Sequence, residues 1–170
     1  MNIRAKAVAA LAAALIALPA AALASGSQSS TVTVNGTVVA NCVGFAQANQ
    51  LNFNPYDVFG TSADLTSTSY SINCTKGSAP TITIDGGQNS SGGNRFMSDG
   101  SGHAAGLLLY NLFQDTGNTS AWPIGSAVTE AGHGSGASET TTITVSGQIP
   151  AGQDVEVGSY SDSLQVTLNF

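Results

Sequence analysis

The sequence predicts an all-β protein, a β-sandwich of the immunoglobulin-like type. Two observations indicate this class. After the first 24 residues, no stretch shows the three-to-four-residue spacing of apolar positions that an amphipathic helix needs. Instead, short stretches that alternate apolar and polar residues are separated by turns rich in Gly, Pro and Asn. Such alternation is the pattern of a strand with one face in a core and one in water.

The N-terminal stretch has the features of a secretory signal peptide. Arg4 and Lys6 precede an apolar run, and a small-residue cleavage signal at 22–24 follows it. We expect residues 1–24 to be removed after Ala24, leaving a single domain with its N-terminal extension. A membrane anchor is the alternative, but the run is short and Pro19 interrupts it. We therefore expect no membrane insertion of the mature chain.

The charge of the mature chain restricts its partners. Without the signal peptide, Lys76 and Arg95 are the only basic residues, against ten Asp and Glu. Binding to nucleic acid or to an anionic membrane depends on basic side chains that neutralise phosphates. We therefore expect neither partner.

Two cysteines, Cys42 and Cys74, predict one disulfide. In an exported protein an even number of cysteines indicates pairing, and two residues allow a single pair. By the chain-entropy model, closing this loop stabilises the fold by roughly 3–4 kcal/mol. A metal site is the weaker alternative, because no histidine lies nearby in the sequence to complete it.

The expected strands follow one another along the mature chain. Residues 31–42 form one long strand or two short ones, because Gly36 interrupts the apolar series there. In residues 140–149, the inward positions are Ile143, Val145, Gly147 and Ile149. The other expected strands are 51–53, 70–74, 81–85, 95–97 and 107–113, with Gly- and Ser-rich loops at 86–106 and 130–138.

An equally strict alternation occupies residues 160–170, at the C-terminal end. Its inward positions are Tyr160, Asp162, Leu164, Val166, Leu168 and Phe170, and the positions between them are polar. We expect Asp162 to form a turn with the backbone of residues 158–160. No strand follows to cover the edge of this one, and exposed edges invite pairing with another chain. Another part of the chain, or another molecule, is therefore expected to close this edge.

Catalytic and cofactor motifs are not found in the sequence. His103 and His133 both lie in Gly-rich loops, where a histidine is typically solvated. The glycine-rich stretches lack the Lys-Ser/Thr of a phosphate-binding loop, and the acidic residues are dispersed. We expect no enzymatic activity, no catalytic residue, no metal and no cofactor.

Three stretches of the chain, 81–87, 109–115 and 158–170, resemble the spore coat protein U domain family. Its members include pilin subunits of archaic chaperone–usher systems. Cys42 and Cys74 match the family's disulfide in position and order. The resemblance covers essentially the whole mature chain, and the C-terminal stretch is its most specific part.

The resemblance implies an incomplete immunoglobulin-like sandwich that is completed by a donated strand. A periplasmic chaperone would lend this strand first, and the extension of the next subunit would replace it at the outer-membrane usher. Residues 25–36 would be the donor, with Val32 and Val34 as its apolar plugs. Residues 37–170 would be the pilin domain, and Leu164, Val166, Leu168 and Phe170 would form the wall of the acceptor groove. Copies of this chain or related pilins would then assemble into a surface fimbria for adhesion or biofilm formation.

Two other functions fit the sequence. A self-contained secreted coat or envelope protein would fold residues 31–39 back onto its own edge and would not polymerise. A sugar-binding module would need an exposed aromatic platform, for which Trp122 is the only free candidate.

Overall fold

The computed structural model describes residues 26–45, 49–129 and 140–170. The chain divides into an N-terminal unit, Met1–Gly36, and a domain, Thr37–Phe170. In the N-terminal unit, residues 26–36 are described, and they are exposed and carry neither strand nor helix. The expected signal peptide (1–24), His133 and the loop at 130–138 lie outside the described residues.

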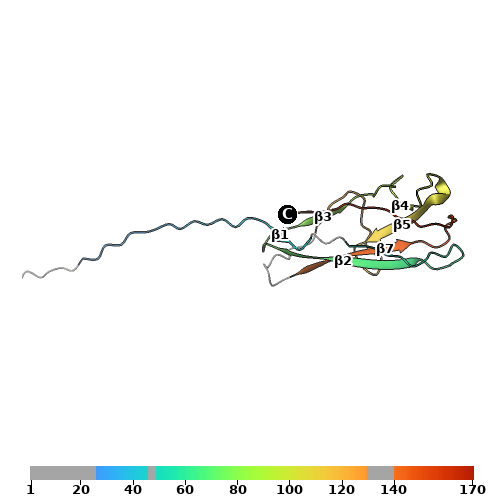
Figure 1. The fold of residues 1–170 in the computed structure, drawn as a ribbon. Helices are drawn as coiled ribbons and strands as arrows, with labels where there is room; N and C mark the ends of the chain where they lie inside the picture. The colour runs from blue at the N-terminus through green and yellow to red at the C-terminus, as the bar shows by residue number, and fades with distance from the viewer. Residues whose placement is uncertain (1–25, 46–48, 130–139) are drawn as a thin grey trace, which may run out of the picture. The chain divides into compact units, whose positions relative to one another are not determined.

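The domain consists of two antiparallel β-sheets, which confirms the all-β class (Figure 1). In the described residues, the only helical element is the 3-10 turn η1 (Ala104–Gly106), and no helix is long and apolar enough to cross a membrane. The larger sheet has the order β1 (Cys42–Val43), β2 (Asp64–Cys74), β7 (Thr141–Ile149), β5 (Leu107–Phe113) and β4 (Arg95–Ser98). The smaller sheet has the order β6 (Val128–Thr129), β3 (Thr81–Ile84) and β8 (Val166–Asn169).

The strands expected at 81–85, 95–97, 107–113 and 140–149 are confirmed as β3, β4, β5 and β7. β2 begins at Asp64, earlier than the expected start at Tyr70. Its first half carries Thr and Ser in place of apolar residues, so the alternation there is hidden. Nine residue pairs with β7 define the strand instead, from Asp64 opposite Ile149 to Ile72 opposite Thr141.

Three expected strands are wrong in extent. Residues 26–41 form no strand, and β1 consists of Cys42 and Val43 alone. Residues 51–53 are not a strand, and the strand expected over 160–170 is β8, which covers only Val166–Asn169. The common reason is that a strand needs a continuous series of main-chain partners. Among the described residues, 26–40 and 51–53 have none, and in 160–165 only Ser161, opposite Ser98, and Gln165, bonded to Asp85, have one.

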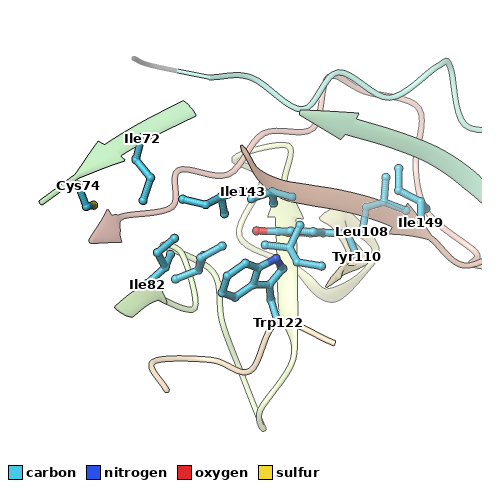
Figure 2. Packing of buried hydrophobic residues seen from close by; sticks show 11 residues of the cluster. Ile72, Cys74, Ile82, Leu108, Tyr110, Trp122, Ile143 and Ile149 are labelled. Atoms are coloured by element: carbon cyan, nitrogen blue, oxygen red, sulfur yellow. The ribbon is translucent and has the colours of Figure 1, made fainter. Parts of the chain in front are cut away.

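The core lies between the two sheets. Ile72 from β2 and Ile143 from β7 face Ile82 from β3, with Trp122 beside them (Figure 2). The Trp122 indole donates to the Thr144 carbonyl at 3.2 Å, so this large side chain is both packed and hydrogen-bonded. The fully or nearly fully buried apolar residues are Ile72, Cys74, Ile82, Ile84, Leu108, Tyr110, Leu112, Trp122, Ile143, Val145 and Ile149.

The small sheet covers only part of the inner face of the large one. On β2, the inward residues Ile72 and Cys74 are buried, whereas Thr66, Thr68 and Tyr70 are only half-buried. The sheets differ in size, with five strands against three. Part of the larger sheet therefore faces a space that no strand of the described residues fills.

Arg95 joins the two sheets from inside the domain. Its side chain is only 5% exposed. The guanidinium donates to the carbonyl oxygens of Asp85 (3.0 Å), Ile84 (3.3 Å), Trp122 (2.9 Å) and Pro123 (3.4 Å). Burial lowers the pKa of Arg95, and nearby Tyr110, Asp85 and Asp162 oppose this shift. Its planar fork therefore ties β4 to the end of β3 and to the Trp122 connector.

Replacing Arg95 is expected to destabilise the domain strongly. Arg95→Met would keep much of the apolar stem but leave four carbonyl groups without this donor, which we expect to cost about 3 kcal/mol. Arg95→Lys keeps the charge but loses the planar fork. Its stability should lie between that of the wild-type chain and that of Arg95→Met. The urea midpoint of the purified mature chain measures both effects. An unchanged midpoint for Arg95→Met would show that these hydrogen bonds contribute nothing to stability.

Candidate interaction groove

Two adjoining hollows lie along the uncovered inner face of the larger sheet. Their volumes are about 590 and 630 Å³, and both are lined by Leu51, Asn52, Phe53, Met97 and Tyr160. We refer to the two together as the groove. One wall is formed by residues 49–59, and the other by residues 155–166.

The floor of the groove is largely apolar and comes from both sheets. Val145 from β7 and Tyr110 from β5 lie beneath the first hollow, and Leu108 and Ile149 lie beneath the second. These four side chains are buried members of the core. An occupant of the groove would therefore extend the core of the domain.

The first wall, residues 49–59, has no strand pairing. Its only main-chain to main-chain hydrogen bond among the described residues joins Gly60 N to Asp57 O, at the far end. Side chains hold the wall instead: Asn49 Nδ2 donates to Ser69 O (2.6 Å), Asn54 Nδ2 to Asp64 Oδ1 (3.1 Å) and Tyr56 OH to Pro150 O (3.0 Å). The peptide groups of residues 50–56 therefore remain available to an added strand.

Phe53 anchors this wall to the sheet below it. Its ring packs over Gly147 of β7, where a Cβ atom would come within 2.7 Å of Phe53 Cζ. Glycine at this position thus makes room for the ring. The contact is one of the few that hold residues 49–59 against the core.

The second wall continues into β8, which is an edge strand. β8 pairs with β3 on one side, and no described strand lies on its other side. Just before it, Gln165 N donates to Asp85 Oδ1 (3.0 Å), and Gln165 O accepts from Asp85 N (3.1 Å). Leu164 and Val166 line the groove from this wall.

Asp162 fixes the second wall to the floor. The expectation that it forms a turn with residues 158–160 is wrong. Its Oδ2 accepts from Tyr110 OH (2.7 Å), and its Oδ1 accepts from Gln88 N (2.8 Å) and Ser163 N (2.9 Å). Burial, followed by the hydrogen bond to Asp162, raises the pKa of Tyr110, so the phenol stays protonated and donates. A Cβ at Gly87 would collide with this carboxylate, which explains the glycine there.

The residues that the sequence pointed to lie in three places. The Cys42–Cys74 disulfide is present, joining β1 to the end of β2. Leu164, Val166 and Leu168 are half-buried against the core, and Phe170 follows β8 and is 56% exposed. Val32 and Val34 belong to the N-terminal unit and are 81% and 88% exposed.

Sequence reasoning missed the wall at residues 49–59 and the pair formed by Tyr110 and Asp162. Leu51 and Phe53 were expected in a short strand, but nothing in their pattern shows that their main chain lacks partners. The position of Asp162 among the inward residues was a usable signal, because an inward carboxylate needs a buried donor. No group of three His, Cys, Asp or Glu in the described residues could hold a metal ion.

The family model of the Spore Coat Protein U domain matches residues 28–167. The chain belongs to the spore coat protein U domain family. This match covers most of the chain, including β1 to β7 and the start of β8. A search of curated proteins finds no match.

Solved structures of pilus subunits are similar to this family member. One is a chaperone–tip adhesion subunit pre-assembly complex, CsuC-CsuE, from archaic chaperone-usher Csu pili of Acinetobacter baumannii. Its identity is 20% and its TM-score 0.54, over 79% of this chain and 40% of that chain. Another is a chaperone–tip adhesin complex of CFA/I fimbriae, with 17% identity and a TM-score of 0.49 over 76% of this chain and 40% of that chain. The chain thus spans about two fifths of the chains it matches, and the first similarity shows a shared fold.

The contact between Phe53 and Gly147 can be tested by adding one methyl group. Gly147→Ala should displace the ring and destabilise the domain by about 1–3 kcal/mol, because the core has no room there. Phe53→Leu in the same chain should recover part of the loss, and the double-mutant cycle in urea measures this coupling. Gly26→Ala is the control, since a methyl there meets nothing within 4 Å. Additive effects of the two substitutions would contradict the packing described.

Proposed function

We propose that this protein is a structural subunit of a chaperone–usher fimbria that polymerises by donor-strand exchange. The observation that carries the proposal is the groove, which has an apolar floor, unpaired main chain along residues 50–56 and, where the other wall leads into β8, a strand edge without a described partner. A strand laid between residues 50–56 and the free edge of β8 would pair with both. Strand addition takes its affinity from such main-chain bonds and its specificity from alternate side chains in pockets.

Residues 25–36 have the properties that a donor strand needs. They contain no charged residue, so their burial requires no desolvation of an ion. Val32 and Val34 lie two residues apart, and in a strand they would face the floor together. Their high exposure leaves both side chains available to another molecule. We propose that this stretch of one copy fills the groove of the next, and that residues 37–170 form the receiving domain.

The remaining parts of the proposal follow from export and from the family. Residues 1–24 would direct the chain to the periplasm, where the disulfide forms under oxidising conditions. A periplasmic chaperone would occupy the groove first, and an outer-membrane usher would exchange it for the next subunit. The similarity to a chaperone–subunit complex supports the chaperone as a partner. The product would be a surface fibre for adhesion or biofilm formation, a structural role in keeping with a structural family.

A charge placed on the donor strand should block polymerisation only when it lies on the face of the strand that enters the groove. Val34→Asp would put a carboxylate into the apolar groove, which is expected to cost several kcal/mol and to lower fibre yield at least about hundredfold. Thr33→Asp is the matched control, because its side chain would point away from the floor. Electron microscopy of cells that also express the chaperone and usher, with counts of denaturant-resistant multimers, gives the yield.

Deleting residues 25–35 provides the complementary test. The shortened subunit should still bind its chaperone but form no fibre. If the intact mature chain, purified alone, is instead a stable monomer that unfolds on this deletion, the protein is a self-contained coat or envelope protein. Equal fibre yields from Val34→Asp and Thr33→Asp would also exclude the proposed donor register.

A second matched pair tests the receiving groove. Leu164→Asp should abolish capture of the chaperone, because Leu164 lines the groove. Thr167→Asp introduces the same charge three residues away, at an exposed position that lines neither hollow, and it should leave capture within about twofold. Co-purification with a tagged chaperone measures both. Capture of the Leu164→Asp subunit at the level of the control would show that this wall does not receive the strand.

A further inference from the structure

The point where the N-terminal extension joins the domain is unusually well defined. Residues 26–40 make no hydrogen bond among the described residues. Asn41 is the first residue that is held: its carbonyl accepts from Thr75 N (2.8 Å) and Thr75 Oγ1 (3.2 Å), and its N–H donates to Thr75 Oγ1 (3.1 Å). The next residue, Cys42, is covalently bonded to Cys74. Tension on the extension therefore reaches the Cys42–Cys74 disulfide one residue after Asn41, where the extension is first held.

The disulfide closes a loop that contains the weakly held wall of the groove. Cys42 and Cys74 are 32 residues apart, and residues 49–59 lie between them. Without the disulfide, a pull on the extension would act on β1, which has only two residue pairs with β2. It would then act on residues 49–59, which side chains hold in place of a strand ladder. The nine residue pairs between β2 and β7 would be the first strong resistance.

With the disulfide, tension takes a shorter path. It passes from Cys42 to Cys74 and then along the chain to β3. β3 is paired over four residues with β8, the strand beside which the neighbour's donor would lie. This path excludes residues 43–73, so the wall at 49–59 bears no tension along the chain. The load is carried between the extension and β8 by one covalent bond and one strand ladder.

We infer that the Cys42–Cys74 disulfide is a mechanical lock that keeps the groove closed around its donor strand when the fibre is pulled. The inference rests on the proposed function, because only an assembled fibre carries tension through the extension. Its role differs from stabilising the isolated fold. It protects one wall of the groove from being peeled away and so prevents release of the adjacent subunit.

Pulling single fibres at constant force, before and after reduction, tests the lock. Reduction is carried out after assembly, so that folding and export are unaffected. Reduced fibres should extend in steps of roughly 70 Å per subunit, the length of residues 43–63 when straightened. Their lifetimes before breaking should be at most about one tenth of those of oxidised fibres, because forced opening follows the unfolding rate. Oxidised fibres should show neither the step nor the shortening.

A variant serves as the control for the reductant. The double substitution Cys42→Ser and Cys74→Ser should behave like the reduced fibre with or without reductant. Identical steps and lifetimes for oxidised and reduced wild-type fibres would overturn the lock while leaving polymerisation intact. Failure of the wild-type chain to form fibres with its chaperone and usher would instead contradict the proposed function, and the lock with it.

Discussion

The unequal size of the two sheets is the constraint on which the rest of this structure depends. Five strands present an inner face that three strands cannot cover. Apolar side chains that are only half-buried along the groove, such as Leu51, Phe53 and Leu164, are unfavourable in water, and so is main chain that lacks hydrogen-bond partners next to them. The half-buried Thr66, Thr68 and Tyr70 mark where the cover ends on β2. A strand supplied from outside relieves both costs at once, which is why the groove and the free extension are best understood together.

The groove is kept in shape by interactions that do not depend on an occupant. Arg95 bonds to carbonyl groups from β3 and the Trp122 connector, and it thereby fixes β4 at the floor. Tyr110 and Asp162 tie the floor to the wall that leads into β8. Hydrogen bonds of buried and charged groups are stronger than those in water, so such ties are rigid. A preformed groove lowers the ordering cost of strand addition.

The opposite wall is built differently, and this difference gives the disulfide its significance. Residues 49–59 are fixed by isolated side-chain contacts, among them Tyr56 to Pro150 and Phe53 over Gly147. A wall of this kind can adapt its main chain to an incoming strand, but it resists peeling poorly. The wall lies within the loop that the Cys42–Cys74 disulfide closes, so it can adapt to a strand and still be protected from peeling. In the proposed fibre, the wall would remain free to pair with the donor strand, and force along the chain would go around it.

The sequence by itself determined the all-β class, the disulfide and the inward side of the long strands. Period two was enough to identify β3 and β7, and to place Ile143 and Val145 in the core, because burial of one face depends only on local alternation. A run that is apolar on both faces identified β5. It also drew attention to the edge of the C-terminal strand. These are properties that a strand carries within its own residues.

Only the tertiary structure decided where strands lack partners. Residues 51–53 and 160–165 have strand-like sequences, yet they are not strands, because a strand requires a continuous partner main chain. Residues 51–53 have no such partner, and 160–165 have only isolated bonds at Ser161 and Gln165. The same holds for Asp162, whose partners Tyr110 and Gln88 lie far away in the sequence. Long-range neighbours leave no local trace in one sequence. The groove exists because no described strand pairs with residues 50–56 or with the outer edge of β8. Whether such a strand is present depends on the arrangement of the whole domain.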